Sequence, residues 1–214
     1  MAAAPEMLRV TEAAVVSGVG VREVNRALDE GILKGFPMGG EARLFSTGAC
    51  AAITFYFGSA ARLTVRERLS TIEGMGPRLM GLSARAFGAS LKEDWTVRHG
   101  FLTIDMAPFL EATAGRLERL AAARAAVASS PDVLGGTPVV AGTRVPVHDV
   151  AASRAAGHAL EAILAAYPTL TAEQVELATM YAEANPARGR PRALPLPEGT
   201  TIVSDRRVAR RARA

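Results

Sequence analysis

The side chains best suited to chemistry in this sequence share one face of a short N-terminal segment. The polar side chains that recur at helical spacing are Arg22, Asn25, Arg26 and Asp29, and the apolar residues expected on the other side of the same segment are Val21, Val24 and Leu28. Arginine and asparagine donors match guanine edges, adenine edges and phosphates in the DNA major groove. The spacing predicts a helix that presents these donors to DNA, although small helical hairpins without a DNA role share much of this pattern.

A helix, a tight turn and a second helix are predicted to position this face. Thr11 has a hydroxyl that can accept a hydrogen bond from the first helical turn, so we expect it to be the N-cap of a helix that reaches Ser17. Residues 18–20, Gly-Val-Gly, break that helix. The second helix is expected over residues 21–30, with Gly31 ending it in the left-handed conformation.

We expect a short β-hairpin after the second helix. Two extended runs, residues 32–33 and 42–45, flank a glycine-rich turn, and Ser46 can cap a helix that follows. Residues 11–33 resemble the winged helix-turn-helix of MerR-type regulators and excisionases, in which a wing after the second helix contacts the DNA backbone. The resemblance implies that Lys34 and Arg43 are the phosphate contacts of this wing.

The charge of this N-terminal segment bears on how many copies would bind DNA. Residues 1–60 carry five basic and six acidic side chains, fewer positive charges than tight binding by a monomer needs. Two copies on two half-sites would double the phosphate contacts. We therefore expect a two-fold homodimer.

The residue types that most often carry catalysis or bind metals are scattered along the chain. His99, His148 and His158 lie in different local settings, and none has a second histidine, a cysteine or a carboxylate at metal-ligand spacing. Cys50, the single cysteine, lies in an apolar run without a nearby base, and no pair of carboxylates is placed for acid–base catalysis. We expect no catalytic residue, no metal and no cofactor, and hence no enzyme.

Two segments of mixed pattern occupy the middle of the chain. Residues 61–94 are interpreted as a helical linker, in which Thr64 and Glu67 have the spacing of a capping box. Residues 95–128 contain two short β-prone runs, expected to form a hairpin, and then a long helix that begins at Pro108 and runs to about Ala128. Its leucines recur on one side, as in a helix that packs on a core or on a partner helix. We expect this segment to dimerise.

The most specific stretch of the sequence is the loop-rich run of residues 130–147, where prolines and glycines prevent a regular helix. Its Gly-Gly-Thr is no phosphate-binding loop, because the lysine before the threonine and the helix directly after it are missing. Three helices are expected next, over residues 148–156, 160–166 and 171–184, the last with Thr171 and Gln174 at the spacing of a capping box. The loop residues that we single out as candidate contacts are Gly136, Thr137, Pro138, Gly142, Thr143 and Arg144.

Residues 130–185 resemble a small family of bacterial domains of unknown function associated with VapB-type antitoxins, whose partners are toxins of PIN-like ribonuclease fold. The resemblance implies a helix-turn-helix-like trihelical domain used for dimerisation, DNA contact or toxin docking. For Gly142-Thr143-Arg144 an alternative stays open, namely a turn whose arginine holds its own loop.

The end of the chain is a basic arm. From Pro186 onward there are eight arginines and two carboxylates, a net charge of +6, whereas the residues before it carry a net charge of −2. Arg-Gly-Arg-Pro at 188–191 is the core of an AT-hook, which enters narrow A·T minor grooves. A toxin with an acidic site offers the same arginines a different target. The arginines expected to contact a toxin or the minor groove are Arg188, Arg190, Arg192, Arg206 and Arg207.

Composition tests three further classes of protein, namely disulfide-bonded, secreted and membrane-spanning proteins. Apolar side chains make up 49% of the 214 residues, enough for a buried core, and a single cysteine excludes a disulfide framework within the chain. The sequence shows neither a signal peptide nor an apolar run of membrane-spanning length. We expect a cytoplasmic protein with no membrane contact.

Together these patterns predict a mainly α fold with short β-hairpins, built from a winged helix-turn-helix and a trihelical helix-turn-helix-like domain. The expected segments are 1–60 winged helix-turn-helix, 61–94 helical linker, 95–128 hairpin and dimerisation helix, 129–185 antitoxin-type domain and 186–214 basic tail. The function that we expect is that of an antitoxin, which inhibits a PIN-like ribonuclease toxin and represses its own operon by binding promoter DNA. The alternative is a stand-alone transcription factor or an excisionase-like architectural protein without a toxin.

Overall fold

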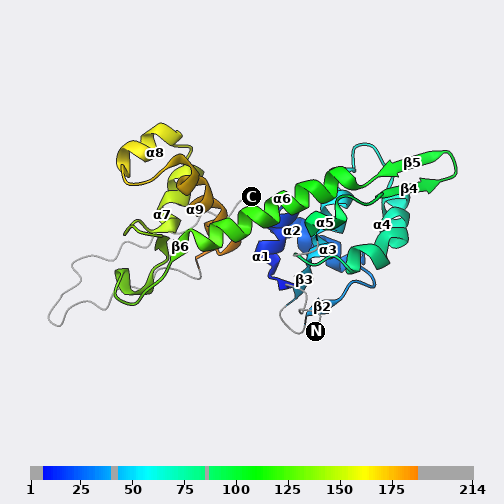
Figure 1. Ribbon diagram of the computed structural model, residues 1–214, viewed down its shortest axis with the longest axis horizontal. Helices are drawn as coiled ribbons and strands as arrows, with labels where there is room; N and C mark the ends of the chain where they lie inside the picture. Colours follow the sequence, from blue (N-terminus) through cyan, green and yellow to red (C-terminus); the bar gives the residue numbers. More distant parts are fainter. Residues whose placement is uncertain (1–6, 40–42, 85–86, 188–214) are drawn as a thin grey trace, which may run out of the picture.

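The computed structural model describes residues 7–39, 43–84 and 87–187. In this part of the chain nine α-helices alternate with short antiparallel strand pairs, so the expected mainly α class is confirmed. The molecule is elongated: one long helix, α6 (Ala107–Ala125), connects an N-terminal lobe to a smaller C-terminal lobe (Figure 1). Among these residues no helix is both long enough and apolar enough to cross a membrane.

The N-terminal lobe is a helical core with two small sheets at its surface. Its elements are β1 (Met7–Leu8), α1 (Val10–Ser17), α2 (Val21–Asp29), β2 (Met38–Gly39), β3 (Leu44–Ser46), α3 (Thr47–Gly58), α4 (Val65–Met80), α5 (Phe87–Ser90), β4 (Thr96–His99) and β5 (Leu102–Asp105). The first sheet has the strand order β1-β3-β2, and β4 pairs with β5 in the second.

Helix α3 forms the centre of this lobe, and its sequence explains why. All residues from Thr47 to Tyr56 are buried, because this helix consists of small and apolar side chains all around. Its N-cap is Ser46, whose hydroxyl accepts a hydrogen bond from the amide of Ala49, as expected. Gly48 lets α4 approach closely, since a Cβ atom there would lie 1.8 Å from the carbonyl oxygen of Leu79.

Two expectations about the start of the lobe were wrong. Helix α1 begins at Val10 with Arg9 as its N-cap, because the Glu12 carboxylate accepts a hydrogen bond from the Arg9 amide and takes over the capping role expected of Thr11. The first strand of the hairpin is β2 rather than residues 32–33, whose side chains are buried in the core instead of alternating across a strand.

Residues 61–94, expected to be a linker, belong to the core of the N-terminal lobe. The capping box of Thr64 and Glu67 is confirmed, and the helix that it starts continues to Met80 even though it contains two glycines and Pro77. Apolar side chains from this segment are buried in the same cluster as those of α1 and α3; they include Ile72, Met75, Leu79, Leu82 and Phe87. The segment therefore builds the lobe instead of connecting two others.

The expected hairpin near residue 100 is confirmed as β4 and β5, which project from the end of the N-terminal lobe (Figure 1). Trp95 anchors its base: the indole is buried, its Nε1 donates to the Ser90 carbonyl oxygen at 2.7 Å, and the guanidinium of Arg78 lies 4.0 Å from the ring centroid. At the tip the side chain of Phe101 is fully exposed.

The C-terminal lobe begins where α6 ends. Its elements are β6 (Val127–Ala128), the 3-10 turn η1 (Leu134–Gly136), β7 (Val139–Val140), α7 (Val147–Ala155), α8 (Leu160–Ala166) and α9 (Ala172–Ala184). The three expected helices are thus present, and the capping box at the start of α9 is confirmed for Thr171 and Gln174. The long helix ends at Ala125, three residues earlier than expected, because the chain turns into β6, which pairs with β7.

The lobe has its own apolar core, made by α7, α8, α9 and β7. Helix α9 also reaches the N-terminal lobe: Val175 and Ala178 are buried in the C-terminal core, whereas Ala184 belongs to the N-terminal cluster. The hydroxyl of Thr11 on α1 donates to the carbonyl oxygen of Ala184 at 2.6 Å. Helices α6 and α9 therefore join the two cores.

Candidate nucleic-acid interface

The turn between α1 and α2 is built on Gly18. This residue has φ = 66°, in the left-handed region, and its amide donates to the Val15 carbonyl oxygen at 3.2 Å. The next amide, that of Val19, reaches back to the Ala14 carbonyl oxygen at 3.1 Å. These two bonds satisfy carbonyls at the end of α1 and turn the chain directly into α2, as the Gly-Val-Gly sequence predicts.

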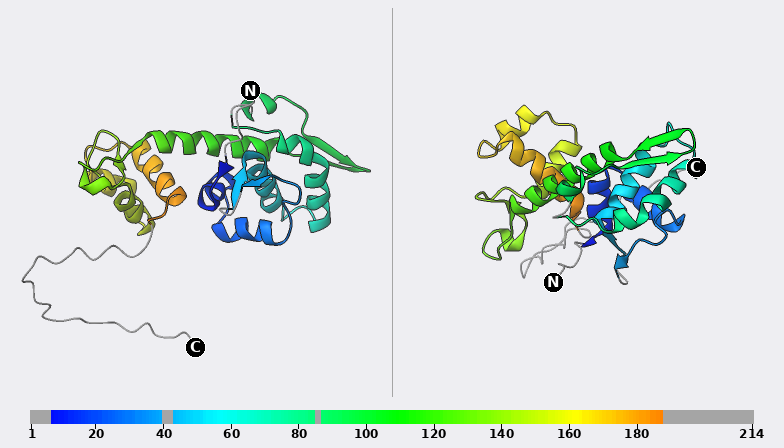
Figure 2. Two further views of the ribbon diagram at one scale, coloured as in Figure 1. Left: turned by 90° about the horizontal axis from the view of Figure 1, so that it is seen from below. Right: turned by 45° about the vertical axis from the view of Figure 1, so that its right-hand side comes forward.

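Helix α2 has the two faces that the sequence predicts, except that Val21 of the expected apolar stripe is 42% exposed at the start of the helix. Val24 and Ala27 are fully buried against the lobe, while Arg22 and Arg26 are exposed and Asn25 is partly exposed. The left panel of Figure 2 shows α2 on the side of the lobe away from α6. The helix is therefore open to a macromolecule approaching from that side.

The hairpin that follows brings further cations to the same region. Lys34 and Arg43 are both exposed. The Arg43 Nη1 lies 3.8 Å from a carboxylate oxygen of Asp29 on α2, and Arg43 itself has φ = 45°. The structure thus places the hairpin next to the C-terminal end of α2.

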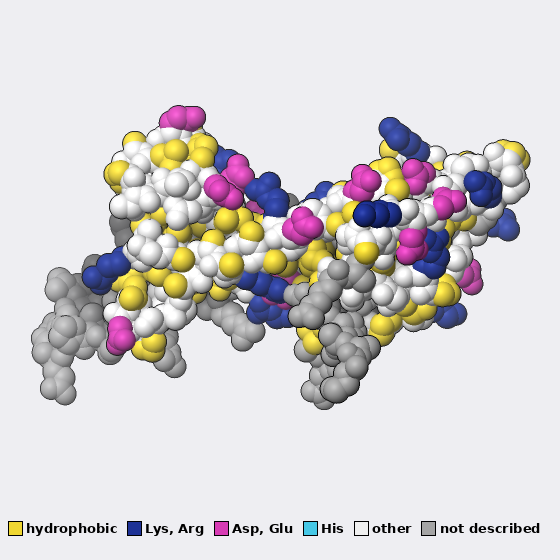
Figure 3. All heavy atoms as spheres, in the orientation of Figure 1, with side chains coloured by type: hydrophobic (Ala, Val, Ile, Leu, Met, Phe, Trp, Pro, Cys, Tyr) yellow, Lys and Arg dark blue, Asp and Glu magenta, His cyan; other side chains and the backbone are white. Residues whose placement is uncertain are grey.

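Carboxylates neutralise part of this surface. The Nε of Arg26 donates to a carboxylate oxygen of Glu30 at 2.7 Å, and this hydrogen bond raises the pKa of Arg26. Asp29 pairs with Arg43, while Arg22 and Lys34 form no ion pair with another described residue. The face of the molecule drawn in Figure 3 likewise shows Lys and Arg interspersed with Asp and Glu rather than an extended patch of one sign.

A buried carboxylate that the sequence analysis missed ties this region to the C-terminal lobe. Glu12 is 4% exposed, and its carboxylate accepts hydrogen bonds from the side chains of Arg9 at 2.8 Å and Arg124 at 2.9 Å. Burial by itself would raise the pKa of Glu12, but these hydrogen bonds and that from the Arg9 amide lower it to about 2. Arg9 also donates to the side chain of Asn185. From the sequence, only the spacing of Arg9 and Glu12 could have indicated an ion pair, since Arg124 is far away in the sequence.

The loop of the C-terminal lobe is held by its own backbone and hydroxyl groups. The Thr137 hydroxyl donates to the Leu134 carbonyl oxygen at 2.8 Å, and the Gly136 carbonyl oxygen accepts from the Ser129 hydroxyl at 2.6 Å. Pro138 accepts from the amide of Val147 at 3.0 Å. The first half of the loop is therefore closed onto the start of α7.

The second half of the loop is a turn. Gly142 has φ = 76°, and the Thr143 hydroxyl donates to the Val140 carbonyl oxygen at 2.8 Å while accepting from the Val145 amide. Arg144 is exposed, and no described residue accepts a hydrogen bond from its guanidinium. Thr143 rather than Arg144 holds the turn, so the guanidinium is available to a partner.

The tail arginines Arg188, Arg190, Arg192, Arg206 and Arg207 lie outside the described residues. The charge around their attachment point can nevertheless be read from the sequence. Residues 127–187 contain two arginines and six carboxylates, a net charge of −4, whereas residues 1–126 have fifteen basic and thirteen acidic side chains. The C-terminal lobe is acidic, and the arm that follows it is strongly basic.

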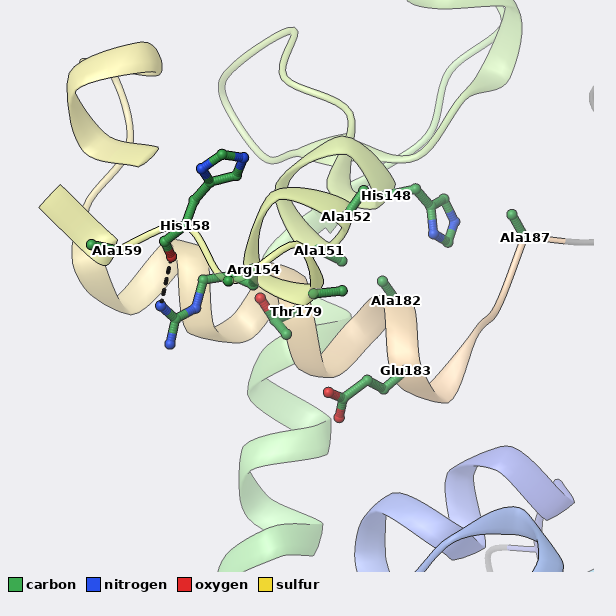
Figure 4. A pocket seen from close by; sticks show the side chains of 12 residues that line it. His148, Ala151, Ala152, Arg154, His158, Ala159, Thr179, Ala182, Glu183 and Ala187 are labelled. Atoms are coloured by element: carbon green, nitrogen blue, oxygen red, sulfur yellow. Dashed lines mark hydrogen bonds between the residues drawn. The ribbon is translucent and has the colours of Figure 1, made fainter. Parts of the chain in front are cut away.

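Two of the histidines border a groove of about 740 Å³ between α7 and α9 (Figure 4). The rings of His148 and His158 point in different directions, and Arg154 donates to the backbone carbonyl oxygen of His158. Half of the residues that line the groove are alanines. Within the described ranges, no three His, Cys, Asp or Glu side chains are grouped so that they could hold a metal ion. Burial raises the pKa of the Cys50 thiol to about 12, which makes it a poor nucleophile.

The C-terminal lobe matches a known domain family. Residues 127–182 match the domain family DUF433, described as a protein of unknown function, and this range coincides with β6 through α9. The expected similarity of this lobe to a small family of domains of unknown function is thus confirmed, while its description mentions no antitoxin, toxin or MerR-type regulator.

The crystal structure of Rv2018 from Mycobacterium tuberculosis covers 79% of this chain and 95% of its own, with 17% identity and a TM-score of 0.32, too low to support an argument. The uncharacterized protein y4eO of Sinorhizobium fredii is 57% identical over 213 residues, which span 99% of this chain and 96% of the relative. The match spans both lobes and the tail, so the chain belongs to the same family as this Sinorhizobium protein.

Proposed function

We propose that the protein is a DNA-binding regulator, and that α1, α2 and the β2–β3 hairpin act as a winged helix-turn-helix. The observation that carries this proposal is the orientation of α2, which buries Val24 while Arg22 and Asn25 remain accessible on the side away from α6. Arginine and asparagine at the start of such a helix can form bidentate hydrogen bonds to guanine and adenine. The hairpin, with Lys34 and Arg43, would meet the backbone beside the groove.

The ion pairs of this surface determine how strongly one copy would bind. Arg26 and Arg43 must each exchange a carboxylate, Glu30 or Asp29, for a phosphate. That exchange leaves the carboxylates near the DNA, where they repel it, so the net gain is small. Two copies on adjacent half-sites compensate for this weakness, which supports the homodimer that we expect from the sequence.

For the C-terminal lobe and the tail we propose the role of an antitoxin, directed at a protein rather than at DNA. The supporting observation is the segregation of charge: the lobe carries −4 and the residues from Pro186 onward carry +6. An acidic lobe is repelled by phosphates. A PIN-like ribonuclease holds its divalent cation with a cluster of carboxylates, and an arginine such as Arg206 or Arg207 placed there would displace the cation and inhibit the enzyme.

Footprinting and titration of the protein on its own promoter test the DNA-binding role. We expect Arg22→Ala and Asn25→Ala to weaken binding to the specific site by about 10- to 100-fold. Arg43→Ala, at a phosphate contact, is expected to weaken binding to all sequences alike and to lower the salt dependence of affinity. Arg144→Ala, in the acidic lobe, is the matched control and should bind normally. Unchanged binding of Arg22→Ala and Asn25→Ala would contradict the assignment of α2.

Growth rescue tests the antitoxin role. A chain that ends at Asn185 should keep its affinity for the promoter but fail to protect cells from a PIN-like toxin encoded beside it. Full protection by the shortened chain would refute this role of the tail. Loss of affinity for A·T-rich promoters would instead assign Arg188, Arg190 and Arg192 to the minor groove, and the absence of any neighbouring toxin gene would favour the stand-alone transcription factor or excisionase-like protein.

A further inference from the structure

A cavity of about 430 Å³ lies where the turn between α1 and α2 meets the end of α3 and the start of α6. Val19, Phe57, Pro108 and Phe109 make its walls largely apolar. The ring of Phe109 packs edge-on against Phe55 behind it, with ring centroids 5.2 Å apart. This volume lies within the range of pockets that hold small molecules.

One arginine enters this apolar cavity without a partner. The Nη1 atom of Arg116 on α6 is the single buried side-chain nitrogen or oxygen of the described residues that has no hydrogen-bond partner. No described carboxylate forms an ion pair with this arginine, and none of the residues around the cavity is acidic. A buried, unpaired donor on a cation is unfavourable, so the site favours an anion.

The position of this guanidinium is fixed by the turn itself. A Cβ atom on Gly18 would lie 2.5 Å from the Cζ of Arg116, so the guanidinium rests directly on the glycine backbone. Gly18 has to be glycine for its positive φ, and the missing side chain also leaves the room that Arg116 occupies. The donor is thereby held at one place in the cavity wall.

The other polar groups of the cavity are already bonded to the protein. The Ser17 hydroxyl donates to the Cys50 carbonyl oxygen at 3.2 Å. The Thr54 hydroxyl lies within hydrogen-bond distance of the Ser17 and Cys50 carbonyl oxygens and accepts from Thr113 at 2.9 Å. Arg116 is therefore the group that can bind a polar part of a ligand.

We propose that this cavity binds a small carboxylate with a flat apolar body, such as an aromatic acid. The carboxylate accepts hydrogen bonds from Arg116, and the ring lies between Phe57 and Phe109. A single cation with apolar walls fits a monoanion better than a phosphate ester, which needs more donors. A bound acid would connect α6 to the turn that precedes α2. The site is independent of the DNA-binding and antitoxin roles proposed above.

Calorimetry on the full-length protein with benzoate and phenylacetate, and with the neutral amides benzamide and phenylacetamide, tests the site. We expect an acid to bind with a dissociation constant of about 1 mM or lower and each amide at least about tenfold more weakly. Arg116→Gln should lose this preference for the acid. Arg119→Gln is the matched control, since that arginine lies on the same helix but is exposed and paired with Glu176. Its binding of the acid should be unchanged.

A second variant keeps the test decisive if Arg116→Gln folds poorly. Ala112 is an exposed residue at the cavity wall, and Ala112→Leu would fill the cavity without changing the core. It should keep its circular dichroism spectrum and lose acid binding by about tenfold or more. The proposal is overturned if acids and amides bind equally, if both variants bind the acids like the unmodified chain, or if no acid binds at about 10 mM.

Discussion

The two lobes use the same turn between two helices but place it in opposite surroundings. In the N-terminal lobe Gly18 and Val19 donate to carbonyls three and five residues back; in the C-terminal lobe Gly157 and His158 do the same after α7. Both glycines have positive φ. Gly18, however, is covered by a guanidinium, whereas a Cβ atom on Gly157 would meet nothing within 4 Å. Both lobes have the same backbone turn, so any difference in their function has to come from the side chains and charges around that turn.

The charges of the lobes differ in the same way. The N-terminal lobe is close to neutral and has two of its exposed arginines, Arg26 and Arg43, beside carboxylates, while the C-terminal lobe has a net charge of −4. A helix-turn-helix pattern in the sequence is thus insufficient to assign DNA binding to either. This difference in charge is the reason that we propose DNA as the partner of the first lobe and a protein as the partner of the second.

The largest expected effect concerns the carboxylate that couples the lobes. Glu12→Gln should lower the free energy of unfolding by about 3 kcal/mol, because the guanidinium groups of Arg9 and Arg124 would face a neutral amide at a buried site. Urea unfolding measures this change. Glu176→Gln is the control: its pair with Arg119 also joins the lobes but is exposed, so we expect a loss of less than about 0.5 kcal/mol. Equal losses in both variants would show that Glu12 has no special role.

Acid titration sharpens the same point. Because the pKa of Glu12 is lowered from 4.5 to about 2 in the folded state, its contribution to stability is complete above the unfolded pKa of 4.5. That contribution is lost as the pH falls from about 4.5 to about 2. The difference in unfolding free energy between the unmodified protein and Glu12→Gln should therefore shrink across this range. A difference that is constant with pH would mean that Glu12 is not the group that titrates.

The two turn glycines provide a matched pair with a smaller effect. Gly157→Ala should cost about 1 kcal/mol, the strain of alanine in the left-handed region. Gly18→Ala should cost more, about 2 kcal/mol, because it also displaces the guanidinium of Arg116. Adding Arg116→Met should recover part of the stability lost in Gly18→Ala and none of that lost in Gly157→Ala. Thermal unfolding of the two glycine variants, of Arg116→Met alone and of the two double variants measures this coupling, and strict additivity would argue against the contact.

The smallest expected effect is a gain in DNA affinity. Glu30→Gln removes the partner of Arg26 and one negative charge from α2, so promoter binding should strengthen by about threefold to tenfold at low salt. Glu173→Gln, on α9 in the acidic lobe, changes the total charge equally and should leave the affinity unchanged if that lobe does not approach DNA. Equal gains from both variants would indicate a general effect of net charge instead of a contact made by α2.

Local signals in the sequence predicted the helices well. Ser46, Thr64 and Thr171 each lie before a helix whose first turn they cap, and Gly18 ends α1 as its neighbours imply. The apolar stripe of α2 and the three helices after residue 147 follow from spacing alone. These features depend on residues within about one helical turn of each other, which is the range over which a sequence pattern is informative.

Features that depend on distant residues could not be predicted. Thr11 looks like a cap, but its hydroxyl bonds Ala184. Glu12 looks like an ordinary acidic residue of a first helical turn, and only the folded chain brings Arg124 to it. Residues 61–94 lack a clear pattern because α4 contains Gly74, Gly76 and Pro77, yet its apolar side chains complete the core. In each case tertiary contacts decide the role of the residue.

Helix α6 also fixes the directions in which its arginines point around the helix axis. Arg116 faces the cavity, Arg119 pairs with α9 and Arg124 pairs with α1. A helix turns by about 100° and rises about 1.5 Å with each residue, so one inserted residue between Arg116 and Arg119 would rotate everything after it away from its partner. Substitutions on α6 can be absorbed one at a time, but a change in its length cannot. The number of residues in this helix is therefore under a stricter constraint than their identity, and it sets the orientation of one lobe relative to the other.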